Sequence, residues 1–148
     1  DLYLIFFFII CYVIYFLYLN MNFFEATKSG FKNYVVFNKR ASRSEFWYFN
    51  LAITLMSAFI VWIEISYGPA DIKTYLEQSN GGPFLNIFSI VTILPTLSIS
   101  VRRLHDRGHS GWNLLWSITI IGLIPLIIIF MLPPKEEDNK WGRNPLLN

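Results

Sequence analysis

The chain has 148 residues, of which 54% are hydrophobic and only 15% charged, with a formal net charge of +2. Soluble domains carry about a quarter charged residues, so this composition argues against an ordinary soluble domain and indicates a membrane protein. The length allows one helical bundle without a second folded domain. The single cysteine, Cys11, excludes an internal disulfide and a multi-cysteine metal site.

Residues 2–19 form an uncharged run that is just long enough to cross a bilayer core of about 30 Å. The run lacks Gly, Ala and Ser, which let membrane helices pack closely, and it precedes Met21. Two interpretations of residues 1–20 stay open. The run is an extra transmembrane helix, or it is translated upstream sequence in front of a natural start at Met21.

Residues 23–36 predict an amphipathic helix that is too polar to cross the membrane and lies in its interface. Apolar side chains recur at helical spacing and polar ones lie between them: Phe23, Phe24, Thr27, Phe31 and Tyr34 alternate with Lys28, Lys32 and Asn33.

Three further stretches that are uncharged except at their ends predict core transmembrane helices over about 46–64, 84–104 and 112–132, followed by a polar tail over 133–148. Ser42 and Glu45 have the spacing of a capping box, which predicts a helix start there. A bend is expected in the third stretch at Gly122 or Pro125. The predicted fold is therefore an all-α integral membrane protein, with residues 21–145 forming one membrane domain. It has three core helices, or four if 2–19 is a real span, and an N-terminal interfacial helix.

Polar side chains form a stripe on each of the first two spans, and such stripes usually mark helix–helix contacts. The first stripe contains Asn50, Thr54, Ser57 and Glu64, and the second contains Ser89, Thr92, Thr96, Ser100 and Arg103. We expect the two stripes to face each other. Pro95 frees a backbone carbonyl that a nearby Ser or Thr hydroxyl can satisfy.

The distribution of basic residues predicts the orientation. The loop after the first span contains only Lys73. Five basic residues lie before the first span, and three lie at the end of the second span and in the turn after it: Lys28, Lys32, Lys39, Arg40 and Arg43, and Arg102, Arg103 and Arg107. This places residues 21–45 and 102–111 in the cytoplasm. A full crossing by 112–132 would put the tail outside. The three basic residues of the tail fit that poorly, so a re-entrant bend at Pro125 is the alternative.

The two basic segments are expected to meet at the cytoplasmic face in one cluster of ten residues: Arg40, Arg43, Glu45, Arg102, Arg103, His105, Asp106, Arg107, Ser110 and Trp112. We expect Glu45 to pair with Arg102 or Arg103, and Asp106 to pair with Arg40 or Arg43. Ser110 is an expected helix N-cap. The remaining positive charge should face anionic lipid headgroups.

His105, Asp106 and His109 raise the question of metal binding or acid–base catalysis. The i, i+4 spacing of the histidines suits zinc only on a continuous helix, which Gly108 disfavours, and adjacent residues on a helix point apart. The sequence predicts no catalytic residue, metal site, cofactor or nucleic-acid partner.

Three segments carry a resemblance to a known family: NYVVFNKRASRSEFWYF, LPTLSISVRRLHDRGHSGW and NKWGRNP. Over roughly Met21 to Pro145 the chain resembles the YhaH-like bacterial inner-membrane proteins, domain of unknown function 805. The resemblance implies a multi-spanning plasma-membrane protein without an established activity. The signature positions that it implies are Arg43, Glu45, Arg102, Arg103, Leu104, His105, Asp106, Ser110 and Trp112. The chain departs from the pattern at His109 and over Glu136–Asn139.

The sequence therefore predicts a non-enzymatic membrane protein whose basic cytoplasmic face binds anionic lipid headgroups or a protein partner. The alternative is a small transporter or channel. It would have to be oligomeric, because three helices enclose little space. A membrane enzyme acting on lipid headgroups through His105 and Asp106 is the third interpretation. No span carries a charged residue near its middle, which argues against a proton or ion pump.

Overall fold

The computed structural model describes residues 21–67, 82–135 and 137–146. Its elements are α2 (Phe23–Lys32), α3 (Arg43–Tyr67), α5 (Pro83–Asp106), the 3-10 helix η1 (Gly111–Ile118), α6 (Ile120–Met131), β1 (Asp138–Asn139) and β2 (Gly142–Arg143). The fold is mostly helical, as predicted. The run over residues 2–19 lies outside the described residues.

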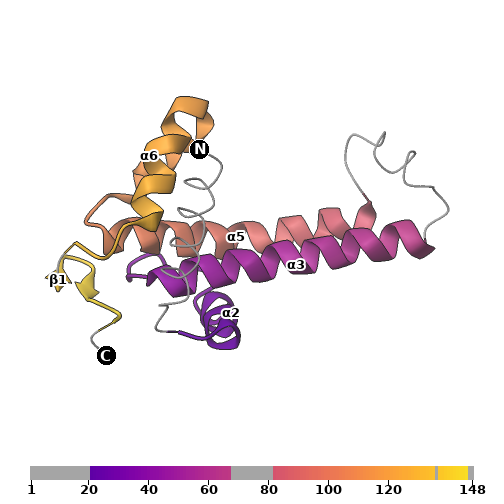
Figure 1. Ribbon diagram of the computed structural model, residues 1–148, viewed down its shortest axis with the longest axis horizontal. Coiled ribbons are helices and arrows are strands. Elements are labelled where there is room, and N and C mark those ends of the chain that lie inside the picture. Colours follow the sequence, from indigo (N-terminus) through magenta and orange to yellow (C-terminus); the bar gives the residue numbers. More distant parts are fainter. Residues whose placement is uncertain (1–20, 68–81, 136, 147–148) are drawn as a thin grey trace, which may run out of the picture.

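Helices α3 and α5 lie side by side and form the long axis of the molecule (Figure 1). With 25 and 24 residues, both are long and apolar enough to cross a membrane. The other described elements gather near the end where α3 begins and α5 ends (Figure 1). We call this the basic end, for the exposed basic side chains described below.

The first turn of α3 follows only half of the predicted capping box. Ser42 caps the helix by accepting a 3.1 Å hydrogen bond from the backbone N–H of Glu45. The Glu45 carboxylate does not return the bond to Ser42. It accepts hydrogen bonds from Ser29 on α2 and Arg102 on α5 instead. The residue that was expected to cap one helix therefore connects three.

At the opposite end, Glu64 of α3 caps the start of α5. Its Oε1 accepts hydrogen bonds from the backbone N–H groups of Phe84 at 2.7 Å and Leu85 at 3.2 Å. These donors have no partner within their own helix, and the N-terminal end of a helix dipole favours a carboxylate. Glu64, the acidic member of the predicted polar stripe, therefore holds the end of α3 against the start of α5.

Two hydroxyl members of the stripes, Thr54 and Ser89, behave differently from the prediction. Thr54 and Ser89 are exposed, and each donates to the carbonyl four residues earlier in its own helix. Short hydroxyl side chains reach that carbonyl easily, so they need no partner on a neighbouring helix. These two residues do not join α3 to α5.

Helix α2 is four residues shorter than predicted. Asn33 ends it, because its side-chain amide donates to the carbonyl of Ser29 at 2.9 Å. The carbonyls of Asn33 and Val36 both lie 2.8 Å from the Ser98 hydroxyl of α5. The chain therefore leaves the helix and continues along α5.

The carbonyl that Pro95 frees is satisfied from another segment of the chain. Because proline has no N–H, the carbonyl of Val91 lacks its helical donor. The hydroxyl of Tyr34 donates to it. The sequence predicted a Ser or Thr for this role. The observed partner lies 57 residues away and holds the connection between α2 and α3 against α5.

The apolar stretch over 112–132 is divided into two short elements and does not form the single span that was predicted. Thr119 has extended backbone angles between η1 and α6, and its hydroxyl caps α6 by accepting from Gly122 at 3.1 Å. The break lies six residues before Pro125, which is inside α6. With 12 residues, α6 is about 18 Å long, shorter than a bilayer core of about 30 Å. It runs at a steep angle to α3 and α5 (Figure 1).

Candidate functional site: a buried charge cluster

Charged side chains are among the most deeply buried groups of the protein. Arg103 and Asp106 are 0% exposed, and Arg102 is 2% exposed. They end α5, and the backbone N–H of Ala41 donates to the carbonyl of Arg102 at 3.1 Å, which holds the segment before α3 against them. Buried charges need partners, because removal from water is costly.

Asp106 is the centre of the cluster and binds two arginines. Its Oδ1 accepts a hydrogen bond from Nε of Arg40 at 2.9 Å and forms an ion pair with Nη2 of the same residue at 2.8 Å. Its Oδ2 pairs with Nη1 of Arg103, one helical turn earlier. Of the two partners predicted for Asp106, Arg40 is the one observed, and Arg103 is an additional partner. Both carboxylate oxygens are therefore occupied by guanidinium groups.

Glu45 forms the second predicted pair. Its Oε1 lies 2.7 Å from Nη1 of Arg102 and also accepts from the hydroxyl of Ser29 at 2.9 Å. Arg102 belongs to α5, Glu45 to α3 and Ser29 to α2. This pair therefore joins the three helices in one contact.

Two arginines bind the chain at the end of the η1–α6 segment. Nε of Arg103 donates to the carbonyl of Phe130 at 3.2 Å, and Nη2 donates to that of Leu132. Nη1 of Arg107 donates to the carbonyl of Pro133 at 2.5 Å. The last carbonyls of a helix lack intrahelical donors and attract cations. As a result, residues 111–132 leave the charge cluster and return to it as a hairpin.

The polar tail folds back onto the same cluster as a short antiparallel hairpin of β1 and β2. Nη1 of Arg40 donates to the carbonyl of Gly142 at 3.0 Å, and the amide of Asn139 donates to the carbonyl of His105 at 2.9 Å. The tail therefore lies at the basic end. A full crossing by 112–132 would have placed it at the opposite end.

His105 is used in packing. Its Nδ1 lies 3.3 Å from the carbonyl of Lys39, and its ring stacks on Trp141 with centroids 4.2 Å apart and planes 9° apart. Over residues 21–67, 82–135 and 137–146, no group of three His, Cys, Asp or Glu side chains is placed to hold a metal ion.

The other predicted members lie around this centre. Ser110 caps η1 by accepting from the backbone N–H of Trp112 at 3.4 Å, while the Trp112 side chain is 78% exposed. Arg43 and Arg107 are partly exposed. The sequence reasoning missed Ser29, Asn139 and Trp141. The WGRNP motif indicated that the tail is distinctive. Sequence periodicity could not predict that the tail contacts the end of α5, some 35 residues earlier.

Exposed basic side chains surround the buried cluster. They lie on α2, on the connection to α3 and on the tail: Lys28, Lys32, Lys39, Lys135, Lys140 and Arg143. At the opposite end, the described residues 55–67 and 82–92 contain no Lys or Arg. Over the described residues, the two ends of the α3–α5 pair therefore differ strongly in their exposed basic side chains.

Comparisons with known proteins identify a family and inner-membrane relatives of this chain. The family described as "Protein of unknown function (DUF805)" matches residues 34–143. Inner membrane protein YhaI of Escherichia coli K12 is 35% identical over 119 residues, covering 79% of this chain and 92% of YhaI. Inner membrane protein YhaH of the same strain is 32% identical over 118 residues, covering 78% of this chain and 92% of YhaH. No solved structure matches the chain. The chain belongs to the DUF805 family, together with these inner membrane proteins.

Proposed function

We propose that this protein is a non-enzymatic inner-membrane protein whose basic end lies in the cytoplasm and binds anionic phospholipid headgroups. The observation that carries the proposal is that the basic side chains fall into two groups with different surroundings. Arg40, Arg102 and Arg103 are buried and paired, whereas the exposed basic side chains surround them at the same end. Each basic residue near an anionic membrane surface contributes about 1 kcal/mol to binding.

The difference in Lys and Arg content between the two ends supports a specific topology. Cytoplasmic segments near membrane helices are enriched in Lys and Arg. In the proposed arrangement α3 and α5 cross the membrane, and η1 and α6 form a re-entrant hairpin. The tail then lies in the cytoplasm, where Lys135, Lys140 and Arg143 obey the same rule. The basic residues of the tail no longer conflict with the orientation.

The contacts of the two candidate catalytic side chains support a non-enzymatic function. Both oxygens of Asp106 bind guanidinium groups, and His105 is stacked on Trp141 and lies against the carbonyl of Lys39. A general base needs a lone pair within reach of a substrate proton. A carboxylate enclosed by two arginines is poorly suited to that role.

Lipid competition tests the function. Purified protein in detergent, mixed with equal amounts of phosphatidylglycerol and phosphatidylcholine of the same chain length, is expected to retain mainly phosphatidylglycerol in native mass spectra. Replacing Lys39, Lys135 and Lys140 together with Gln is expected to lower this preference by at least about fivefold, because each cation attracts the anionic headgroup. Glu25→Gln is the control and should not lower it. Equal retention of the two lipids by the unaltered protein would contradict the proposal.

Cysteine labelling tests the topology. In a Cys11→Ser background, single cysteines replace Ser66, at the end of α3, and Arg143, in β2. A membrane-impermeant maleimide added to intact spheroplasts is expected to label the cysteine at 66. It should label the cysteine at 143 only after the membrane is permeabilised. Labelling at 143 in intact spheroplasts would place the tail outside and refute the re-entrant hairpin.

A further inference from the structure

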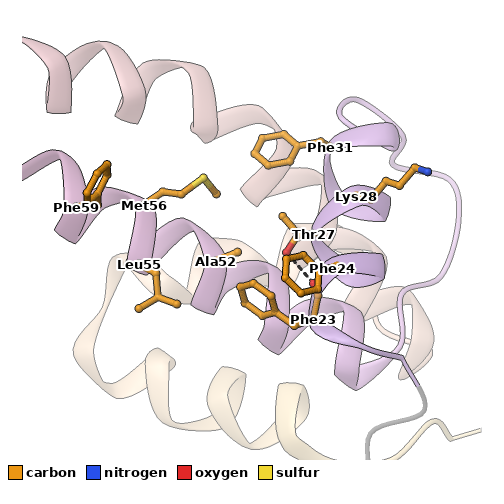
Figure 2. Close-up of a pocket in the computed structure, with 9 residues that line it drawn as sticks. All are labelled: Phe23, Phe24, Thr27, Lys28, Phe31, Ala52, Leu55, Met56 and Phe59. Atoms are coloured by element: carbon orange, nitrogen blue, oxygen red, sulfur yellow. Dashed lines mark hydrogen bonds between the residues drawn. The ribbon is translucent and has the colours of Figure 1, made fainter.

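A groove between α2 and α3 opens beside the basic end (Figure 2). Its volume is about 560 Å³, within the range of about 300–1,000 Å³ that is typical of small-molecule sites. Four residues of α3 and five of α2 line it: Ala52, Leu55, Met56 and Phe59, and Phe23, Phe24, Thr27, Lys28 and Phe31.

The walls of this groove suit an apolar occupant. The hydroxyl of Thr27 donates to the carbonyl of Phe23 at 2.8 Å, so it offers no free donor to a ligand (Figure 2). Phe24 is 81% exposed and Phe59 is 59% exposed, so large apolar side chains border the opening. Lys28 is the only charged residue among those that line the groove.

Lys28 lies at the border between the apolar and polar faces of α2. At 100° per residue, Phe23, Thr27, Phe31 and Phe24 span an arc of about 100°, and Lys28 follows Phe24 after a further 40° or so. Its ammonium group points away from α3, toward the outer side of α2 (Figure 2). The stem of Lys28 therefore contributes to the groove while its charge stays at the rim.

We infer that the groove holds an acyl chain of an anionic phospholipid, whose phosphate binds the Lys28 ammonium group. The inference rests on the proposed function and names one site for it. Charge complementarity selects the lipid, because the one charged residue of the lining, Lys28, is a cation on a flexible stem at the rim. A second helix fits less well. Helices pack closely in membranes through small residues, whereas these walls are mostly Phe, Leu and Met.

Two substitutions test the site from different sides. Leu55→Trp fills the groove, and Lys28→Gln removes the charge at its rim. Leu51→Trp and Glu25→Gln are the controls, because these exposed residues lie on the same helices, do not line the groove and are not among the basic side chains proposed to bind headgroups. Each protein is titrated with phosphatidylglycerol in detergent and the bound lipid is counted by native mass spectrometry. Elution volume and unfolding temperature report on folding.

The unaltered protein is expected to retain one phosphatidylglycerol more tightly than the rest. Leu55→Trp should abolish that binding step, Lys28→Gln should weaken it about fivefold, and both controls should retain it. Unchanged binding in Leu55→Trp and Lys28→Gln would overturn the site, even if phosphatidylglycerol is still preferred overall.

No preference in the unaltered protein would overturn the proposed function itself. A dimer that Leu55→Trp dissociates, with lipid binding unchanged, would assign the groove to a second copy and overturn the inference. If Leu55→Trp misfolds, the exposed Lys28→Gln substitution decides.

Discussion

Asp106→Asn is expected to destabilise the protein by about 3–5 kcal/mol, the cost of leaving a buried ion pair without one partner. The carboxylate binds Arg40 and Arg103 at once, and both of these side chains are buried. An amide of nearly the same size carries no charge and presents an N–H group toward one guanidinium. Two buried cations would then remain without a counter-charge.

Thermal unfolding of the purified protein in detergent, followed by tryptophan fluorescence, measures this effect. A loss of this size lowers the unfolding temperature by on the order of 10 °C in a domain of this length. Asp138→Asn is the matched control, because Asp138 is exposed, and it should shift the midpoint little. An Asp106→Asn protein as stable as its parent would show that Asp106 does not stabilise the fold. That result would favour a catalytic role for this carboxylate.

Arg103→Ala is expected to release the η1–α6 hairpin and the chain that follows it. Arg103 joins Asp106 to the carbonyls of Phe130 and Leu132, so its removal leaves a buried carboxylate with one partner fewer and α6 without its cation. We expect the free energy of unfolding to fall by about 3 kcal/mol. Trypsin should also cleave faster after Lys135, because the preceding chain is no longer held.

Arg107→Ala provides the comparison for that experiment. Arg107 also donates to a carbonyl of this segment, that of Pro133, but it is partly exposed and does not bind Asp106. Its loss should cost only about 1 kcal/mol, the typical net contribution of one hydrogen bond. Equal effects of the two substitutions would show that the carbonyl contacts, and not the buried pair, hold the hairpin.

The parts of the fold that depend on local sequence were predictable. An uncharged run long enough to cross a bilayer favours a helix, and α3 and α5 follow this expectation closely. Ser42 and Ser110 cap helices because an N-cap acts over two or three residues. The pairs Glu45–Arg102 and Asp106–Arg40 follow from two oppositely charged segments that must meet at one end.

The parts that depend on distant partners were not predictable. Residues 112–132 are uncharged throughout, so composition cannot distinguish one span from a hairpin that returns. The difference arises because Arg103 and Arg107 bind carbonyls 26–29 residues later in the chain. The same applies to Tyr34, whose partner carbonyl is exposed by a proline in another helix, and to Trp141, which packs on His105. Hydrophobicity carries no information about any of these contacts.

The connectivity of the charge cluster has a consequence for biosynthesis. Arg40 is translated 66 residues before Asp106, and the carbonyl of Gly142 that it also binds comes 102 residues after it. In the proposed topology, the Arg40 guanidinium group therefore remains in water on the cytoplasmic side until these partners have been synthesised. The cluster can close only after the last strand has emerged. Nascent chains that stop before residue 142 should therefore remain open at this end and be vulnerable to membrane proteases.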